Sequence, residues 1–385
     1  MSSPAQARID LEAIGANIAL LREHAGGAEV MAMVKAEAYG HGLVPAAWAA
    51  LAGGASWLGV AKLDEALRLR DGGVTGVRTL VCLCTPGEPF ERAVAADVDL
   101  AAGSVRLVRE IAEAAVRAGR PARVHLKADT GMSRGGAAPD DWAALVDAAL
   151  AEEAAGHLRV VGLMSHLACA DEVGHPANAR QVAAFREMVE HAEKAGVRPE
   201  VRHLANSAAT LTLPEARFDL VRPGIATYGL TPVPQLGDFG LRPAMTLSAG
   251  AALVKRVAAG SGVSYGHTYL TERDTTLAVV PVGYGDGIPR HGSNLLEVLA
   301  GGRRRRIAGR VCMDQFVIDL GDDALAAGDE IILFGPGDRG EPTAQEWADA
   351  LGTISYEIVT RIGARVPRVY AGRSASRPHE GVRHG

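Results

Sequence analysis

Features that mark membrane, secreted or nucleic-acid-binding proteins are missing from this sequence of 385 residues. No apolar run reaches the roughly 20 residues that a membrane-spanning helix needs. Arg8, Asp10 and Glu12 place charges where a signal peptide would have its apolar segment. The formal net charge of −5 favours neither nucleic acid nor an anionic membrane as a partner. We therefore expect a cytoplasmic protein that acts on a small molecule.

Cysteine is scarce, and its spacing excludes two structural roles. The four cysteines contain no CxxC pair, so we expect neither a zinc ribbon nor a disulfide framework, and no bound metal. They are Cys82, Cys84, Cys169 and Cys312.

Lysine is also scarce, which leaves few candidates for amine chemistry. Of the 40 basic residues, only five are lysines. They are Lys35, Lys62, Lys127, Lys194 and Lys255.

Short β-rich runs alternate with helical patterns over the first 225 or so residues. The runs lie at 30–35, 56–60, 79–84, 98–101, 123–127, 160–166, 201–206 and 220–222. Amphipathic stretches between them include 62–70, 104–119, 140–155 and 177–195. Eight such alternations predict an α/β fold with an N-terminal (β/α)8 TIM-like barrel, although a doubly wound sheet would show the same alternation.

The pattern changes in a segment rich in proline and glycine at 231–243, after which short β-like runs dominate. They lie at 253–257, 277–282, 306–311, 315–320 and 330–334, while the four arginines at 303–306 are interpreted as an exposed hairpin turn. We place the barrel at 8–235 and a mostly β C-terminal domain at 243–372, with the first few residues able to pack on that second domain. We expect the tail at 373–385 to be disordered.

Polar residues end five of the eight predicted barrel strands, where barrel enzymes gather their reacting groups. Any one of them could equally have a structural role at the rim, but five together favour a site. They are Lys35, Lys127, His166, the pair Asn206–Ser207, and Arg222.

Lys35 is the strongest candidate for covalent chemistry. Burial at a strand end disfavours the ammonium form and leaves an amine suited to a Schiff base, although a salt bridge at the rim is the plainer alternative. Lys62, Lys194 and Lys255 are more simply surface charges, because two lie at helix ends and one in the second domain. Lys127 is the only other lysine that is a candidate for the Schiff base.

Nine motifs between about residues 8 and 370 are similar, in order, to those of the alanine racemase family. They are MVKAEAYGHG, KADTGMSR, MSHLACAD, HLANSAAT, VRPGIATYGL, VSYGHTY, PVGYGDG, GRVCMD and ISYEIVTRIG. The resemblance implies a barrel followed by a mostly β domain, in agreement with the prediction above. It also implies a homodimer that uses pyridoxal 5′-phosphate to interconvert L- and D-alanine and supplies D-alanine for peptidoglycan.

The resemblance assigns the catalytic roles. Lys35 would hold the cofactor and act as the base on the D-alanine face, and Tyr265 of the partner subunit would be the base on the opposite face, because racemisation needs two acid–base groups. Arg222, supported by His166, would bond to the pyridine nitrogen. Since guanidinium keeps its protons, that nitrogen would stay unprotonated, which favours racemisation over transamination.

Other motif residues would contact the cofactor or the substrate. Those implied for cofactor binding, mostly at the phosphate, are Tyr39, Asn206, Ser207, Gly224, Ile225 and Tyr356. Arg134 would contact the substrate carboxylate, with Lys127 carbamylated beside it. Tyr284 and Met313, flanked by Cys312 and Asp314, would come from the partner subunit, so a monomer would be inactive.

Two positions depart from the family pattern, and the alternatives are few. Glu37 stands where Asn or Asp is usual, and Gly285 replaces a common Ala and would open space at the entrance. A racemase of broader specificity that acts on serine stays open, as does a non-catalytic pyridoxal-phosphate-binding protein. A barrel decarboxylase of basic amino acids is disfavoured, because it would have an acidic residue in place of Arg222.

Overall fold

The computed structural model describes residues 4–372, so the predicted disordered tail at 373–385 lies outside the described residues. The chain forms two compact units. We call Ile14–Ala38 with Leu43–Leu241 the barrel unit, and Tyr39–Gly42 with residues 4–13 and 242–372 the β unit. No helix within the described range is long and apolar enough to cross a bilayer.

The barrel unit is built on one parallel sheet of eight strands, in the order β8-β7-β6-β5-β4-β3-β2-β9. Each of the eight predicted runs overlaps a strand. The strands are β2 (Glu29–Met33), β3 (Trp57–Val60), β4 (Arg78–Val81), β5 (Asp99–Ala102), β6 (Ala122–Lys127), β7 (Leu158–Met164), β8 (Val201–His203) and β9 (Leu220–Val221). Strands β2 to β8 follow chain order around the sheet, whereas a doubly wound sheet reverses its order at a switch point.

The ring of strands closes between β8 and β9. The backbone N–H of Asp219 donates to the Arg202 carbonyl at 3.1 Å, and that of Arg222 donates to the Ala205 carbonyl at 2.9 Å. On its other side β9 pairs in parallel with β2. The predicted barrel is therefore confirmed.

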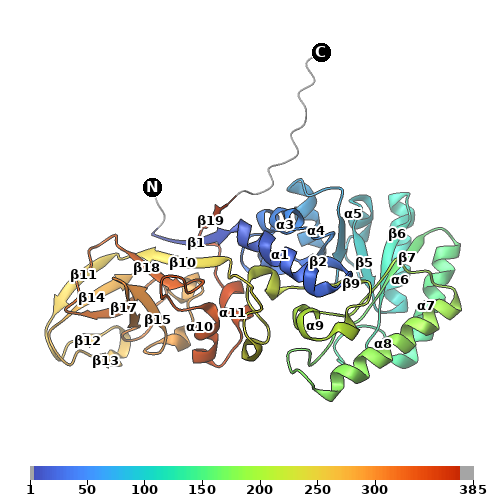
Figure 1. The fold of residues 1–385 in the computed structure, drawn as a ribbon. Helices are drawn as coiled ribbons and strands as arrows, with labels where there is room; N and C mark the ends of the chain where they lie inside the picture. The colour runs from blue at the N-terminus through green and yellow to red at the C-terminus, as the bar shows by residue number, and fades with distance from the viewer. Residues whose placement is uncertain (1–3, 373–385) are drawn as a thin grey trace, which may run out of the picture. The chain divides into compact units, whose positions relative to one another are not determined.

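Helices alternate with these strands and surround them (Figure 1). The barrel-unit helices are α3 (Leu43–Ala52), α4 (Leu63–Asp71), α5 (Phe90–Ala95), α6 (Val105–Ala118), α7 (Pro139–Ala154), α8 (Pro176–Ala195) and α9 (Ser207–Thr212), while α1 (Leu11–Ala25) begins in the β unit. Sequence signals set their ends. In α6 the Ser104 side chain accepts the Leu107 N–H, and Gly119 stops the helix at φ 68°.

The β unit holds three antiparallel or mixed sheets and two short helices, α10 (Ala344–Leu351) and α11 (Ser355–Thr360), so the expected mostly β second domain is confirmed. The largest sheet has the order β16-β15-β18-β10-β1-β19, with the N-terminal strand between β10 and β19. The strands are β1 (Ala5–Asp10), β10 (Met245–Gly250), β11 (Leu253–Val257), β12 (Gly262–Val263), β13 (Tyr269–Leu270), β14 (Thr275–Val280), β15 (Glu297–Ala300), β16 (Arg303–Arg306), β17 (Phe316–Gly321), β18 (Glu330–Phe334) and β19 (Arg368–Ala371).

Two predictions for this unit were wrong. The four arginines form the edge strand β16, paired with β15, and the turn is Gly301–Gly302, whose φ angles of 57° and 74° suit a two-residue hairpin. Charged side chains are tolerated there because an edge strand faces solvent. The expected strand at 306–311 is instead a loop with a single bridge from Ile307 to Ile318, since Gly309 at φ 81° interrupts it.

Candidate active site

Lys35 stands at the carboxyl end of β2 and is followed by a left-handed turn. Four non-glycine residues, 36 to 39, have φ between 53° and 56°, followed by Gly40 at 84°. The left-handed conformation costs roughly 1–2 kcal/mol for each such residue. A segment of this kind persists only where its surroundings hold it.

Glu65 on α4 is one group that holds the turn. Its Oε1 accepts the Ala36 N–H at 2.6 Å, and its Oε2 accepts the N–H groups of Ala61 and Lys62 at 2.9 and 3.0 Å. The carboxylate is buried. It therefore ties the residue after Lys35 to the segment that follows β3, and sequence reasoning missed it.

Glu37, the departure from the family pattern, points to the surface of α4. Its carboxylate forms an ion pair with Arg68, and its Oε2 accepts the Leu43 N–H at 3.4 Å. About half of the side chain is exposed, at 48%. The extra methylene is thus accommodated by an ion pair at the surface.

Arg222, just after β9, is buried, with 5% of its surface exposed. Its Nη1 donates to the His203 carbonyl at 2.8 Å and lies 2.8 Å from His203 Nδ1. Its Nη2 donates to the carbonyls of Ser165 and Leu204 at 2.6 and 3.2 Å and lies 3.3 Å from His166 Nδ1. Within residues 4–372 its Nε–H has no partner, so one donor is left for an acceptor such as a ring nitrogen.

Two histidines flank this guanidinium. Burial, and then the charges of Arg222 and Arg134, lower the pKa of His166 to about 3, so its ring is neutral at pH 7. Burial and the Arg222 charge also hold the pKa of His203 well below its usual value. His166 was expected beside Arg222, whereas the closer His203 was missed although it opens the HLANSAAT motif. The pKa of Arg222, lowered by burial to about 10, still leaves it charged at neutral pH.

The candidate phosphate residues of the barrel unit lie together after β8 and β9. The Ser207 hydroxyl oxygen accepts the N–H groups of Gly224 at 2.8 Å and Ala226 at 3.4 Å. Ile225 opens the turn that follows, and Asn206 caps α9 through the Ala209 N–H at 3.0 Å. These two bonds use the lone pairs of the hydroxyl oxygen and leave its hydrogen to donate to an oxyanion.

The two remaining candidates for phosphate contact, Tyr39 and Tyr356, both belong to the β unit. Their ring centroids lie 6.1 Å apart at an angle of 51°. The structure therefore brings these two rings together from motifs more than 300 residues apart in the chain.

Lys127 and Arg134 supply positive charge at the carboxyl end of β6. Lys127 Nζ donates to the Cys82 carbonyl at 3.4 Å. Burial lowers the pKa of Lys127, and the charges of Arg222 and Arg134 lower it further. Arg134 is exposed on a loop whose N–H groups converge on Asp129 Oδ1, and it has no hydrogen-bond or ion-pair partner in the described part of the chain.

Tyr265, Tyr284 and Met313 gather on one surface of the β unit. The Tyr284 N–H donates to the Cys312 carbonyl at 3.0 Å, and the Gly285 N–H donates to the Met313 carbonyl at 2.8 Å. A hollow of about 580 Å³ is lined in part by Tyr265 and Met313. The three side chains are 71%, 43% and 54% exposed, respectively, which is unusual for large apolar groups.

Gly285, the second departure, leaves room that a neighbouring arginine occupies. A Cβ at this position would lie 2.7 Å from Arg365 Nη1 and 3.1 Å from the Met313 carbonyl oxygen. Arg365 is held there by Asp286 at 3.1 Å and Asp314 at 2.7 Å. The space is therefore filled by an ion-paired side chain.

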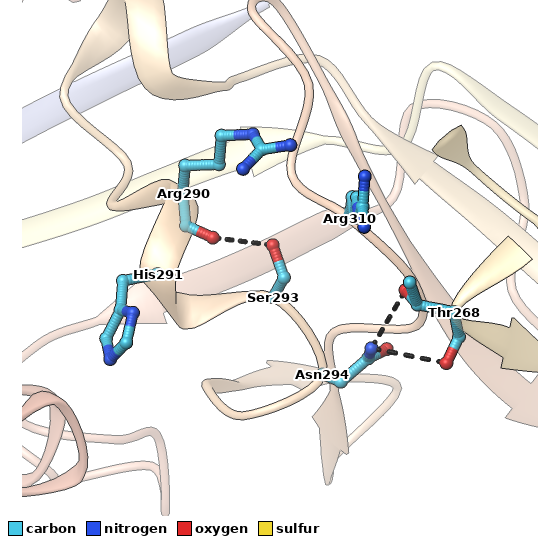
Figure 2. Close-up of a pocket in the computed structure, with 6 residues that line it drawn as sticks. All are labelled: Thr268, Arg290, His291, Ser293, Asn294 and Arg310. Atoms are coloured by element: carbon cyan, nitrogen blue, oxygen red, sulfur yellow. Dashed lines mark hydrogen bonds between the residues drawn. The ribbon is translucent and has the colours of Figure 1, made fainter. Parts of the chain in front are cut away.

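A basic pocket of about 530 Å³ lies in the same unit (Figure 2). Ser293 Oγ donates to the Arg290 carbonyl at 2.6 Å, and Arg310 lines the pocket from the next segment. The Arg310 carbonyl in turn accepts the Ser264 hydroxyl at 2.6 Å. The pocket wall is thus bonded to the residue that precedes Tyr265.

The closed barrel, with a lysine after its first strand and a buried arginine after its last, joined to a β unit, defines a two-domain barrel enzyme. Models of the alanine racemase N-terminal and C-terminal domains match residues 9–232 and 244–370. The chain belongs to the alanine racemase family, which confirms the resemblance of the nine motifs. Enzymes of this family are isomerases that depend on pyridoxal phosphate.

Individual relatives match over nearly the whole chain. The alanine racemase of Thermobifida fusca (strain YX) is 62% identical over 372 residues, which are 97% of this chain and 99% of that protein. The crystal structure of alanine racemase from Streptomyces lavendulae has a TM-score of 0.95 at 56% identity and covers 97% of this chain and 98% of its own. The crystal structure of alanine racemase from Bartonella henselae is described with covalently bound pyridoxal phosphate. It has a TM-score of 0.86 at 28% identity and covers 96% of this chain and 100% of its own.

Proposed function

We propose that the protein is an alanine racemase that uses pyridoxal phosphate to interconvert L- and D-alanine as a homodimer. The observation that carries this proposal is Arg222, a buried guanidinium at the barrel mouth whose Nε–H has no partner among the described residues. The full-length similarity to alanine racemases supports the choice of substrate.

The residues in place fit the cofactor. Lys35 would hold it covalently, and the Nε–H of Arg222, which has no partner in residues 4–372, suits its ring nitrogen. The Ser207 hydroxyl hydrogen and the Ile225 N–H would donate to its phosphate, and Gly224, whose N–H donates to Ser207, would hold that hydroxyl beside it. Asn206 orders that loop, and His166 adds to the support of Arg222. We also propose Tyr39 and Tyr356 as contacts of the phosphate. When bound, the cofactor supplies an electron sink that makes the α-proton of the amino acid acidic.

Two residues would move that proton. Lys35 would exchange it with the substrate Cα on the D-alanine face, and the partner subunit's Tyr265 would exchange it on the L-alanine face. The high exposure of the Tyr265 ring supports this assignment, because a partner subunit could then reach it. Dimer formation would therefore be required for activity.

Arg222 would direct the reaction toward racemisation. Its pKa of about 10 keeps it a proton donor in hydrogen bonds at neutral pH without transfer of the proton. The ring nitrogen that it contacts would stay unprotonated, which limits electron withdrawal and disfavours transamination.

The substrate carboxylate would be bound by cationic and partner-derived groups. Arg134 is an exposed guanidinium without an ion-pair partner in residues 4–372, and Lys127 beside it would be carbamylated to offset the positive charge. Tyr284 and Met313 would narrow the entrance from the partner subunit. We further propose a cytoplasmic location and a role in supplying D-alanine for peptidoglycan.

The test is to supply the purified protein with pyridoxal phosphate and L-alanine, and in a second reaction with D-alanine. Both reactions should approach an equal mixture of enantiomers without release of carbon dioxide. Serine, lysine and ornithine run in parallel measure selectivity, and Lys35→Ala is the inactive control. Absence of racemisation, or carbon dioxide from a basic amino acid, would contradict the proposal.

A further inference from the structure

Four buried polar side chains form a line through the interior of the barrel. Asp99 is the first residue of β5, His125 lies within β6, His203 ends β8 and Arg222 follows β9. Asp99 Oδ2 lies 3.2 Å from His125 Nε2, and His125 Nδ1 lies 2.8 Å from His203 Nε2. His203 Nδ1 lies 2.8 Å from Arg222 Nη1. The line thus joins the amino end of the strands to the carboxyl end, where Arg222 lies.

The barrel makes specific room for His125. A Cβ on Gly162 of β7 would lie 2.0 Å from His125 Nδ1, so any side chain there would displace the ring. The pairing of β6 with β7 shifts register between Val124 and His125. The Trp57 ring packs edge-to-face on the His125 ring, with centroids 5.7 Å apart. These features hold the imidazole in one place.

The chemistry of the two ends determines where every proton lies. Arg222 can only donate, so His203 Nδ1 must carry a lone pair and its Nε2 the hydrogen. The Nδ1 of His125 then accepts that hydrogen, and its own Nε2–H donates to Asp99. All three hydrogen bonds therefore point toward the carboxylate, and both rings are neutral.

The carboxylate end is firmly anchored. Arg78 donates to Asp99 Oδ2 at 2.6 Å, and Arg123 donates to Asp99 Oδ1 at 2.6 Å. Burial opposes ionisation of Asp99, but the hydrogen bonds from His125 and Arg78, together with the Arg78 charge, outweigh it and lower the pKa of Asp99 to about 2. Asp99 therefore remains an acceptor at neutral pH.

We propose that Asp99 and His125 are positioning residues that act through His203 to aim the Nε–H of Arg222 at the ring nitrogen of the cofactor. This inference rests on the proposed function for its catalytic consequence. The line of four hydrogen-bonded side chains transfers no proton, because each imidazole ring is held in one tautomer by fixed partners. Its effect is to keep the His203 Nδ1 lone pair directed at Arg222, so that the guanidinium cannot rotate.

The first experiment reads the protonation of the rings without substrate or cofactor. Solid-state ¹⁵N NMR of the full chain labelled at histidine should show protonated Nε2 and unprotonated Nδ1 for His125 and His203, assigned with His125→Gln and His203→Gln. A doubly protonated ring, or an Nδ1–H tautomer at either position, would overturn the proposal. Because alanine plays no part, this result stands even if the protein does not racemise alanine.

The second experiment measures the consequence for Arg222 in the protein loaded with pyridoxal phosphate. Asp99→Asn should lower kcat about tenfold while KM for alanine stays within about twofold, because orientation and not binding is lost. The fraction of cofactor converted to the amine form during turnover should rise. If kcat and the fraction of cofactor converted to the amine form are both unchanged, the positioning role is overturned.

The matched control is Asp97→Asn, the same substitution at the same end of the barrel. Asp97 accepts a hydrogen bond from Arg123 but does not belong to the line of four hydrogen-bonded side chains. Its φ of 57° suits Asn. This control should leave kcat and the fraction of cofactor converted to the amine form unchanged. If Asp99→Asn fails to fold, the pair His125→Leu and His125→Gln replaces it, because only Gln can accept from His203. Rescue of kcat by Gln supports the proposal, and equal loss in both variants contradicts it.

Discussion

Arg222 Nη1 lies 2.8 Å from His203 Nδ1, so a guanidinium at the mouth of the barrel is held by a histidine deep among its strands. Burial and the Arg222 charge hold the pKa of His203 well below its usual value, which keeps the ring a neutral acceptor. A protonated His203 ring would repel Arg222 and would have no lone pair to accept its hydrogen bond. The electrostatics and the geometry of this pair therefore reinforce each other.

Arg222→Lys should lower racemisation by about a hundredfold or more, because a single ammonium cannot replace the fork that bonds His203 and Ser165 and still donate through Nε. Steady-state rates in both directions measure the loss. Arg306→Lys on the exposed edge strand is the matched control and should change neither rate. Near-normal rates in Arg222→Lys would mean that the guanidinium has no role at the ring nitrogen.

Tyr265→Phe and Tyr269→Phe should have opposite effects. Tyr265 is highly exposed, so loss of its hydroxyl should leave the unfolding free energy and the cofactor absorbance intact while racemisation falls strongly. Tyr269 donates to Asp319 at 2.8 Å, so its loss should cost about 1 kcal/mol of stability without affecting the rate. Denaturant titrations and racemisation assays on both variants test this. The reverse pattern would remove Tyr265 from the reaction.

Glu65→Gln should weaken cofactor binding and lower the unfolding free energy by about 1–3 kcal/mol. An amide cannot accept the N–H groups of Ala36, Ala61 and Lys62 together, because its NH2 group would face one of these donors. Cofactor affinity is measured by absorbance titration. Glu91→Gln, at an ion pair on the surface, is the control. Unchanged cofactor affinity in Glu65→Gln would show that the left-handed turn keeps its conformation without the Glu65 carboxylate.

Asp99 should make stability depend on pH in the acid range. Its pKa in the folded protein is about 2, below the ordinary value of 3.8, so the unfolded chain binds the proton first as pH falls. The resulting stabilisation, about 2 kcal/mol, is present above pH 4 and is lost as pH falls toward 2. Denaturant titrations from pH 5 to pH 2 should show a shallower decline for Asp99→Asn. Parallel curves would mean that the carboxylate titrates normally.

Lys127 should take up carbon dioxide. Burial and the charges of Arg222 and Arg134 lower its pKa, which raises the fraction of free amine that carbamate formation requires. Protein equilibrated with ¹³C-bicarbonate should show a carbamate signal in ¹³C NMR that disappears in Lys127→Ala and persists in Lys62→Ala. A signal that survives in Lys127→Ala would place the carbamate elsewhere, and no signal in the wild type would leave Lys127 as an amine.

Much of the barrel was predictable because parallel strands buried on both faces read as continuous apolar runs. The candidate residues at strand ends, Lys35 and Arg222 among them, could be located for the same reason. The β unit was harder. The run at 303–306 looked like a turn because its residues are all charged, and only pairing with β15 shows that it is an edge strand.

The residues that sequence reasoning missed act from inside the fold. Glu65 looked like an ordinary helix residue, and only the left-handed turn beside it gives its carboxylate three donors. His125 stands within the run ARVHLK, where a polar residue inside a buried strand was the available signal. Asp99 gave the same signal at the start of its strand.

The sequence by itself determined the alternation of strands with helices and the polar residues at the ends of five strands, because apolar periodicity and chain order are local properties. Only the tertiary structure decided that His125 enters the barrel beside Gly162 and joins Asp99 to His203. The pairing of β6 with β7 shifts register just before His125, and partners 26 and 78 residues away meet only when β5 to β8 come together in one sheet.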